Sequence, residues 1–466
     1  MRILDTGLVY ANPKPHLHTR HAFHPTLVDL GGGELLCGYD VGRAVEGLDY
    51  RTYLARSRDG GATWEPEGPL LPDRWADGYT HSVRLSAAAG GLVGFGALHR
   101  RDDPAEGIVN HATLGMVPMN LILVRSDDRG ASWSDPEIID TPLTGPAFEI
   151  CHAIVELPDG RCLAPTATWA GWDGERPEGR KTVVLESDDG GRTWPRYAVM
   201  FDGTAEGVEH WEVSVVPLGG DRVLAVSWVC HTESGSHRPN RYALSGDGGR
   251  SFEPPAELSL RGQTCKAVAL SDGRVLFVYR RIDPPGLWAV PGTLNGGGWR
   301  YGEHLLLWNG GLADSGMTGA GGASDELAAL KFGFPQMIER DGGEVLVVFW
   351  CFEDWSTRIR WIRLDVSRTD PAGPARQDGA DTFDDRHAVV ARSYSRTRTS
   401  AGRPHSSDRA RIIAKVSGRR RCSTSDACGW DPINSARSFW RRPRASMTCS
   451  RAEIGSGASI GHRLAS

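Results

Sequence analysis

The sequence predicts an all-β fold, a six-bladed β-propeller with four-stranded antiparallel blades. Two internal repeats and a glycine-rich composition predict it. The first repeat is the pattern S-x-D-x-G-x-[ST]-[WF], which occurs four times at intervals of 69, 61 and 58 residues. The copies begin at Ser57, Ser126, Ser187 and Ser245. Such regular spacing is typical of folds in which one supersecondary unit is repeated.

Each copy of the pattern follows a strand-like run, such as residues 53–56 or 182–185, and so predicts a hairpin turn. The Asp carboxylate can accept hydrogen bonds from turn amides, the Gly allows a positive φ, and the aromatic ring packs under the turn. The sequence therefore predicts structural rather than catalytic roles for Asp59, Asp128, Asp189 and Asp247.

A second repeat consists of two apolar strand runs, usually joined by a glycine-containing turn, as in residues 25–37. The unit returns near residues 82, 153–160, 213–218, 267–273 and 335–338. Six units in about 340 residues fit the roughly 40–60 residues that a four-stranded blade needs. We expect residues 3–10 to add a strand to the last blade and close the ring, because closure removes exposed sheet edges.

Composition also favours a large β protein. The chain has 58 Gly and 16 Trp, and it contains no apolar run near the ~20 residues of a membrane span. Its first residues contain no apolar segment typical of a secretory signal, so we expect a cytoplasmic protein with no membrane partner. Scattered cysteines without metal-ligand spacing predict buried, reduced thiols and neither a metal nor a cofactor. They are Cys37, Cys151, Cys162, Cys230, Cys265 and Cys351.

The last hundred residues have a different composition from the predicted propeller, which we place at residues 1–366. Residues 367–466 form an Arg- and Ser-rich, low-complexity tail with 18 Arg, one Lys and nine acidic residues. A segment with so few apolar residues cannot offset the entropy of ordering, so we expect disorder or out-of-frame translation. A basic arm for nucleic acid or a membrane surface is the alternative. We expect no function for the tail and no nucleic-acid partner.

The repeated S-x-D-x-G-x-[ST]-[WF] pattern resembles the Asp-box of the sialidase (neuraminidase) superfamily, also called BNR-repeat proteins. The resemblance covers roughly residues 1–366 and implies a six-bladed propeller with a carbohydrate as its partner. In this family the site lies at a central funnel lined by the innermost strands. The resemblance therefore implies an exo-glycosidase that hydrolyses a terminal, acidic sugar.

Alignment of the six units predicts which residues line the funnel at one depth. They are His24, His81, Cys151 with its neighbour His152, Glu212, Thr264 and Phe334. The resemblance implies that Glu212 is catalytic, whereas Phe334 occupies the place of the family's nucleophilic tyrosine and has no hydroxyl group. We predict His24 and His81 as further catalytic residues and His152 and Phe334 as substrate contacts. The alternative for each histidine is a hydrogen-bonded structural role.

The family's substrate-binding arginines and its acid are matched only in part. Arg43 matches the second-strand arginine, Arg280 takes the place of another, and the first is missing from residues 22–25. An ion pair with a loop acid is the alternative for both arginines. The resemblance implies that Asp49 is the acid/base residue. We expect the rings of Trp169 and Trp211 to stack on sugar faces, and packing between the blades is the alternative for each.

The residues leave three chemistries open. Glu212 with a second carboxylate, Asp49 or Glu149, would form a two-carboxylate glycosidase. A histidine base, His24, His81 or His152, would form a uronate lyase. A non-catalytic glycan-binding propeller is the third possibility, because a fold alone fixes no function. A long second-blade insertion, from residue 99 to about residue 119, is predicted to form a pocket wall or lid.

Overall fold

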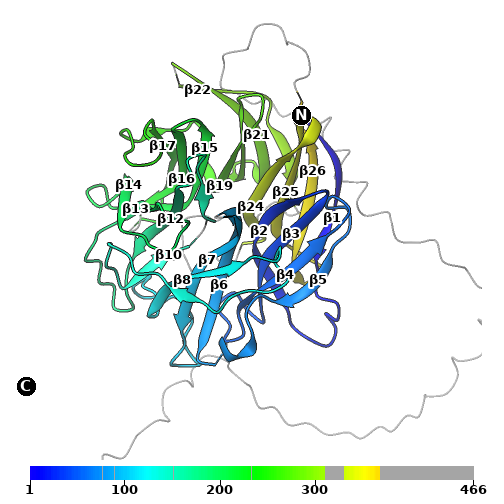
Figure 1. The fold of residues 1–466 in the computed structure, drawn as a ribbon, viewed down its shortest axis with the longest axis vertical. Helices are drawn as coiled ribbons and strands as arrows, with labels where there is room; N and C mark the ends of the chain where they lie inside the picture. The colour runs from blue at the N-terminus through cyan, green and yellow to red at the C-terminus, as the bar shows by residue number, and fades with distance from the viewer. Residues whose placement is uncertain are drawn as a thin grey trace, which may run out of the picture. The chain divides into compact units, whose positions relative to one another are not determined.

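The computed structural model describes residues 1–75, 77–88, 90–150, 152–231, 234–296, 298–309 and 330–367. Within these ranges the chain is made of β-strands and loops, with short 3-10 turns at Asp73–Trp75 and Asp341–Gly343 (Figure 1). No helix in this part of the chain is long and apolar enough to cross a membrane. The predicted tail, residues 367–466, lies outside the described residues except for Ser367.

Six antiparallel sheets surround a central axis (Figure 1), which confirms the predicted six-bladed propeller. The first three blades are built in chain order from the innermost strand outwards. Blade one contains β2 (His21–Gly31), β3 (Glu34–Gly42), β4 (Arg51–Ser57) and β5 (Glu65–Pro69). Blade two contains β6 (Tyr79–Ala88), β7 (Gly91–Arg100), β8 (Met119–Ser126) and β9 (Glu137–Ile138). In blade three, β10 (Ala147–Glu149) and β11 (Val155–Glu156) both pair with β12 (Cys162–Trp169), followed by β13 (Lys181–Ser187) and β14 (Arg196–Asp202).

The remaining blades follow the same order. Blade four contains β15 (Val208–Gly219), β16 (Arg222–His231), β17 (His237–Ser245) and β18 (Ala256–Glu257). Blade five contains β19 (Gly262–Ala269), β20 (Val275–Ile282), β21 (Pro285–Asn295) and β22 (Gly298–Tyr301), with β23 (Leu305–Trp308) also pairing with β21. Blade six contains β24 (Phe332–Arg340), β25 (Glu344–Glu353) and β26 (Ser356–Asp365).

The N-terminal strand β1 (Arg2–Tyr10) completes blade six by pairing antiparallel with β26. This pairing confirms the predicted closure of the ring, which joins the two ends of the propeller by a ladder of hydrogen bonds. Val9 and Tyr10 also enter a buried cluster with residues of β2, β3, β25 and β26. The ring is thus closed by both a backbone ladder and apolar packing.

The four repeated turns have the structure predicted for them. In the first, Oδ1 of Asp59 accepts a hydrogen bond from the Thr63 amide at 2.9 Å, and Oδ2 accepts one from the Thr63 hydroxyl at 2.5 Å. The Ser57 hydroxyl accepts a hydrogen bond from the Gly61 amide at 2.8 Å. The same bonds recur at Asp128, Asp189 and Asp247. The carboxylates therefore satisfy turn donors, as a structural role requires.

Arginines of the preceding blade bind the backbone of these turns and so join neighbouring blades. Arg340 and Arg363 of blade six donate to the Gly60 carbonyl at 2.6 and 3.2 Å. Arg56 of blade one donates to the Arg129 carbonyl at 3.1 Å. Arg125 of blade two donates to the carbonyls of Gly190 and Gly191. The amide of Gly60 also donates to the Gly33 carbonyl, which places this turn beside the far end of β2.

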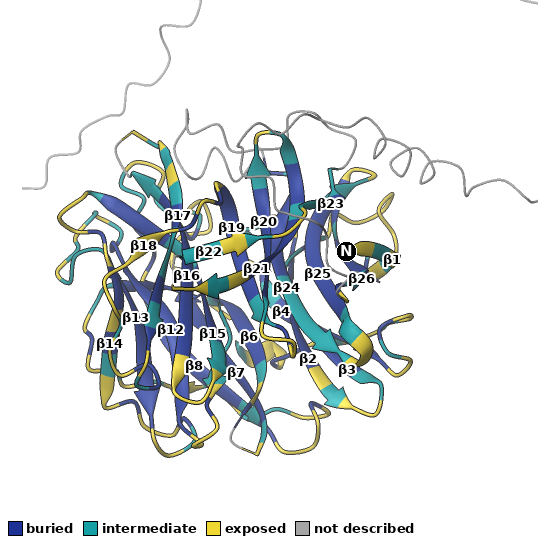
Figure 2. Ribbon diagram, turned by 90° about the horizontal axis from the view of Figure 1, so that it is seen from above, coloured by how far each residue is buried: buried dark blue, intermediate teal, exposed yellow. Residues whose placement is uncertain are grey.

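Burial follows the strands, whereas the loops at both ends of the blades are the exposed segments (Figure 2). Five cysteines lie in the described part of the chain, and four of them are buried. Burial raises the pKa of the Cys265 thiol to about 12, so this thiol stays protonated at neutral pH. Cys151 lies outside the described residues.

Acid should weaken the fold through the repeated turns. Hydrogen bonds from the Thr63 hydroxyl and amide lower the pKa of Asp59 to about 2, and those from Ser132 lower the pKa of Asp128 to about 2. The pKa of each carboxyl is lower in the folded chain than in the unfolded chain, where it is near 3.8. Each ionised carboxylate therefore stabilises the fold above about pH 3.8, and this stability is lost as the pH falls towards 2.

We therefore expect the urea midpoint of the unmodified protein to fall between pH 6 and pH 3 more than that of an Asp59→Asn/Asp128→Asn variant. The asparagines keep an acceptor oxygen but cannot titrate. Urea unfolding at the two pH values measures the difference. Equal pH dependence in both proteins would contradict this account.

Candidate functional site

Four innermost strands carry a β-bulge at the residue that the repeat alignment singled out. The bulge residues have left-handed backbones, with φ of 47° at His24, 49° at Glu212, 48° at Thr264 and 51° at Phe334. At each of them the register of the innermost strand shifts against its neighbour. Residues other than glycine adopt this conformation at a cost of about 1–3 kcal/mol, and such bulges redirect side chains at functional sites.

Contacts connect six residues, one from each blade, into a group that we call the inner cluster. Its members are His24, Arg84, Glu149, Glu212, Lys266 and Phe334. The ring of Phe334 lies 5.0 Å from the ring of His24, centroid to centroid, and the Lys266 ammonium lies 4.9 Å from the Phe334 centroid. The Arg84 guanidinium lies 5.1 Å from the same centroid. All six blades therefore converge on one part of the central channel.

Side chains of blades three and five hold the backbone of Glu212. Its amide donates to both carboxylate oxygens of Glu149 at 3.2 Å, and its carbonyl accepts a hydrogen bond from the Lys266 ammonium at 2.8 Å. The Glu212 carboxylate accepts a hydrogen bond from the Trp228 indole at 2.7 Å. The backbone and side chain of this residue are thus positioned independently, by partners on different strands.

His24 is oriented by a relay of two side chains from its own blade. Its Nδ1 lies 2.7 Å from the Tyr50 hydroxyl and 3.5 Å from Oδ2 of Asp40. The Tyr50 hydroxyl donates to Asp40 at 3.2 Å. With this direction of donation, Nδ1 of His24 carries the proton and Nε2 carries a lone pair. Burial and the Asp40 carboxylate raise the pKa of the Tyr50 phenol, so Tyr50 stays protonated.

A buried ion pair supports this relay. Asp40 is 0% exposed and accepts a hydrogen bond from Arg84, itself 3% exposed, at 3.0 Å. Thr52 and Ser82 donate to the same carboxylate at 2.7 and 2.6 Å. Burial raises the pKa of Asp40, but the Arg84 guanidinium, His24 and the hydrogen bond from Ser82 outweigh burial and hold it below its usual range. Asp40 is therefore a fixed negative charge beneath His24.

Only two members of the inner cluster are partly exposed, His24 and Glu212. Arg84, Glu149, Lys266 and Phe334 are buried, with exposed fractions between 1% and 7%. Phe334 lies where the family resemblance placed a tyrosine nucleophile, and its amide donates to the Thr264 hydroxyl at 3.0 Å. The two partly exposed members of the inner cluster thus carry an imidazole and a carboxylate.

An aromatic ladder lies beside Glu212. Trp211 stacks on Trp228, with ring centroids 5.2 Å apart and an interplanar angle of 9°. Trp211 also makes a T-shaped contact with Trp169, at a centroid distance of 4.5 Å. Trp169 is 4% exposed and its indole donates to the Leu114 carbonyl. The partly exposed Trp211 ring can therefore meet a ligand, whereas Trp169 supports it from the interior.

Arg43 and Asp49 lie together in the loop between β3 and β4. The Arg43 amide donates to Asp49 at 3.1 Å, and the two side chains form an ion pair at 3.5 Å. Their exposed fractions are 81% and 41%. This loop leaves blade one at the same end as His24, so both residues lie at the rim of the channel. The ion pair between Arg43 and Asp49 is the alternative that the sequence left open.

The other predicted site residues are buried between blades or lie further along the channel. Arg280 is 3% exposed and donates to the Gln263 side chain and the Phe332 carbonyl, which joins blades five and six. His81 is 1% exposed between blades one and two, and burial lowers its pKa to about 4. This neutral, enclosed imidazole does not suit the catalytic role predicted for it. His152 lies in the interruption between β10 and β11 and faces a separate cavity.

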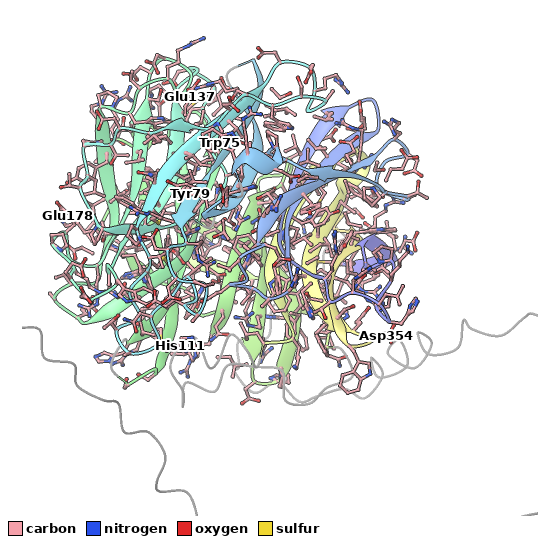
Figure 3. All side chains as sticks on the ribbon, turned by 90° about the horizontal axis from the view of Figure 1, so that it is seen from below. Trp75, Tyr79, His111, Glu137, Glu178 and Asp354 are labelled. Atoms are coloured by element: carbon pink, nitrogen blue, oxygen red, sulfur yellow. The ribbon has the colours of Figure 1, made fainter. Side chains whose placement is uncertain are left out.

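The second-blade insertion, residues 101–118, connects the loops of blades one and three. The Glu46 carboxylate accepts hydrogen bonds from the amides of Ile108 and Val109 at 2.7 and 3.2 Å. Asn110 and Thr113 donate to the Trp172 carbonyl. His111 of this insertion and Asp354 of the β25–β26 turn lie along the same edge of the molecule in Figure 3. The insertion is thus a braced wall at the rim.

Sequence reasoning did not single out Asp40, Tyr50, Arg84 or Lys266. Three of them left a signal, because Asp40, Arg84 and Lys266 are charged residues inside otherwise apolar strand runs. Charged side chains are almost never fully buried unless they are paired. In the described residues, no group of three His, Cys, Asp or Glu side chains is arranged to hold a metal ion.

Comparison with known proteins extends these findings. Residues 108–347 match the family model of the BNR repeat-like domain. No curated protein sequence matches the chain. A solved structure of a Dyadobacter fermentans protein of unknown function is similar, with a TM-score of 0.59 and 21% identity over 78% of this chain and 99% of that one.

Two solved glycosidases share the fold. The Hadza microbial sialidase Hz136 has a TM-score of 0.54 and 18% identity, over 74% of this chain and 66% of its own. The α-L-arabinanase of Penicillium chrysogenum, complexed with arabinobiose, has a TM-score of 0.54 and 13% identity over 78% of this chain and 99% of its own. At these identities the similarity shows a common fold.

The Asp40–Arg84 pair should be essential to stability. We expect Asp40→Asn to lower the free energy of unfolding by about 3–5 kcal/mol, because Arg84 is then buried without its counter-charge. Urea unfolding measures the change. An Asp40→Asn/Arg84→Met variant, which removes both charges, should recover a large part of the loss. The prediction is wrong if Asp40→Asn alone is as stable as Asp40→Asn/Arg84→Met.

Proposed function

This chain belongs to the BNR repeat-like domain family of the sialidase superfamily, and we propose that it is a sialidase-like exo-glycosidase that hydrolyses a terminal, acidic sugar. The observation that carries the proposal is the exposure pattern of the inner cluster. Four of its residues are buried, and only an imidazole, His24, and a carboxylate, Glu212, are open to a ligand. Glycoside hydrolysis needs one group at the anomeric carbon and another at the leaving oxygen.

Glu212 is the group proposed to act at the anomeric carbon. Phe334 has no hydroxyl group, so a tyrosine-type attack is impossible from that position. The Glu212 carboxylate, held by the Trp228 indole, would instead attack directly or activate a water molecule. Glu149 binds the Glu212 amide with both oxygens, which suits a positioning residue.

His24 is the group proposed to move the proton of the leaving oxygen. Its Nδ1 is anchored by Tyr50 and Asp40, so Nε2 is the nitrogen open to the substrate, and a proton bound there in the imidazolium form of His24 would pass to the leaving oxygen. Asp49 at the rim is the alternative donor, as the family resemblance implies. His24 is preferred because two side chains fix its orientation, whereas Asp49 is bound only to the exposed Arg43.

The acidic character of the sugar is inferred from the rim. The Arg43 side chain, 81% exposed in the β3–β4 loop, is a cation that a substrate carboxylate could bind. Trp211 offers a partly exposed ring beside Glu212 for stacking on a sugar face. Together they would hold an acidic sugar between the rim and the carboxylate.

A uronate lyase is a second candidate, because the His24–Tyr50–Asp40 relay suits a base. Nε2 of His24 would remove the proton beside a uronate carboxylate, the electron pair would form a carbon–carbon double bond, and the glycosidic oxygen would leave with a proton taken from water. Arg43 would neutralise the carboxylate in this reaction. The product is an unsaturated sugar that absorbs in the ultraviolet.

Replacement of Glu212 tests the hydrolase. We expect the protein to release sugar from one class among sialosides, uronides and neutral glycosides, and Glu212→Gln to lower kcat/KM at least about 100-fold. Chromatography of released sugar measures turnover. Glu257→Gln, an exposed glutamate on β18, is the matched control and should leave turnover unchanged. Unchanged turnover in Glu212→Gln would exclude the proposed role of this carboxylate.

Replacement of His24 separates the two reactions. If the protein is a hydrolase, His24→Ala should slow release of a natural glycoside much more than release of an activated aryl glycoside, whose leaving group needs little protonation. If it is a lyase, His24→Ala should abolish an ultraviolet-absorbing product, while Glu212→Gln retains it. Binding of glycans without any product would reject both reactions and favour a binding propeller.

A further inference from the structure

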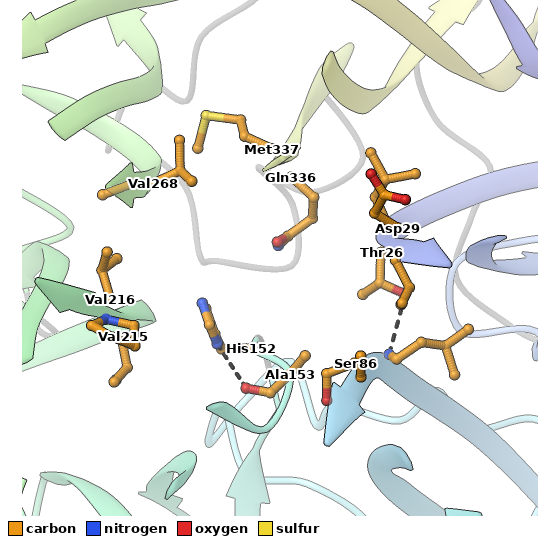
Figure 4. A pocket seen from close by; sticks show the side chains of 16 residues that line it. Thr26, Asp29, Ser86, His152, Ala153, Val215, Val216, Val268, Gln336 and Met337 are labelled. Carbon is orange, nitrogen blue, oxygen red and sulfur yellow. Dashed lines mark hydrogen bonds between the residues drawn. The ribbon is translucent and has the colours of Figure 1, made fainter. Parts of the chain in front are cut away.

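A second cavity lies in the central channel, on the side of the repeated turns. Its volume is about 300 Å³, and all six innermost strands or their loops line it (Figure 4). The lining residues follow the bulge residues along each strand, as Thr26 follows His24 and Gln336 follows Phe334. None of the four bulge residues lines the cavity, and Arg84, Lys266 and the Phe334 ring that both contact precede its lining residues along their strands. The cavity is therefore distinct from the mouth that holds Glu212.

Polar groups without partners face this cavity. The Ser86 hydroxyl and the Gln336 amide nitrogen are buried atoms that have no hydrogen-bond partner among the described residues. Figure 4 shows Gln336 and His152 pointing towards the centre of the cavity from different blades. Nδ1 of His152 lies 2.8 Å from the Ala153 carbonyl and so carries the proton, which leaves Nε2 as an acceptor. Buried groups of this kind are normally satisfied, by protein, water or a ligand.

The lining selects against charge. Burial, followed by the nearby Lys266, lowers the pKa of His152 to about 4, so the imidazole is neutral at pH 7. The sixteen lining residues include no Lys or Arg, and their single carboxylate, Asp29, accepts a hydrogen bond from the Gly31 amide. An anion would find no Lys or Arg in the lining, and the one charged group, the Asp29 carboxylate, is exposed and already bound by the Gly31 amide.

The apolar part of the lining suits the carbon atoms of a small ligand. Val215, Val216, Val268 and Met337 share the cavity with Ser86, Gln336 and His152, so donors and acceptors alternate with apolar surface. A volume of about 300 Å³ is at the lower end of the ~300–1,000 Å³ of ligand pockets, which suits a single sugar ring or a short polyol.

We propose that this cavity is a second binding site, for a neutral polyhydroxylated ligand of monosaccharide size. The hydroxyl groups would accept a hydrogen bond from the Gln336 amide, donate one to Nε2 of His152 and pair with Ser86, while the sugar C–H groups contact the valines. The site does not depend on the chemistry at Glu212, and the two faces of the channel can be occupied independently.

Saturation-transfer NMR on the full chain tests the site with D-glucose, D-galactose and glycerol as neutral probes and D-glucuronate as the charged one. We expect at least one neutral probe to bind, and a Ser86→Ala/Gln336→Leu variant to weaken its binding at least about tenfold, because two hydrogen bonds are lost. Ser234→Ala, an exposed serine on the β16–β17 loop, is the control. Glu212→Gln should leave this binding unchanged, which separates it from the funnel mouth.

A crystal soaked with the probe that binds provides a check that does not depend on the variants. Density for the sugar between Gln336 and His152 would support the site. Ordered water alone in the cavity, density for glucuronate there, or equal binding by Ser86→Ala/Gln336→Leu would each overturn it. Circular dichroism of the variant shows whether a loss of binding comes from unfolding, and in that case the soaked crystal decides.

Discussion

The bulges on the innermost strands are the constraint on which the site depends. Each places a residue other than glycine in the left-handed region and removes backbone groups from the sheet ladder, and these groups must then find other partners. Side chains of neighbouring blades provide them, as Glu149 and Lys266 do for Glu212, Thr264 does for Phe334, and Arg84 does for the His24 carbonyl at 3.3 Å. The interactions that hold the blades together at the axis are therefore the ones that shape the channel mouth.

The two ends of the propeller have different structural roles. At one end, the repeated turns and the arginines that bind their carbonyls join successive blades, and the β1–β26 ladder closes the ring. At the other end, loops of unequal length form the rim, with the insertion of blade two braced against blades one and three. Because the turns and the ring closure supply stability, the strained bulges and buried charges at the axis are tolerated.

Buried charge is the main feature of the channel interior. Asp40 and Arg84 lie together in an almost fully buried pair, and their hydrogen bonds satisfy the charged groups that burial would otherwise penalise. This network orients His24 through Tyr50. A carboxylate and an oriented imidazole are thus partly exposed at a site where Phe334 stands at the position predicted for the family's tyrosine. The chemistry that we propose follows from that replacement.

The sequence by itself determined the number of blades, the closing strand, the roles of the repeated aspartates and the alignment of His24, Glu212, Thr264 and Phe334. These follow from local, periodic signals, since a turn or a strand pair repeats the same residue types at the same spacing. Only the tertiary structure decided which polar residues meet. In the folded chain His81 is enclosed between blades, and His152 faces the cavity on the side of the repeated turns. Arg280 lies between blades five and six, and Asp40 pairs with Arg84. Such contacts depend on strand register and on side chains from other blades, so no local sequence pattern predicts them.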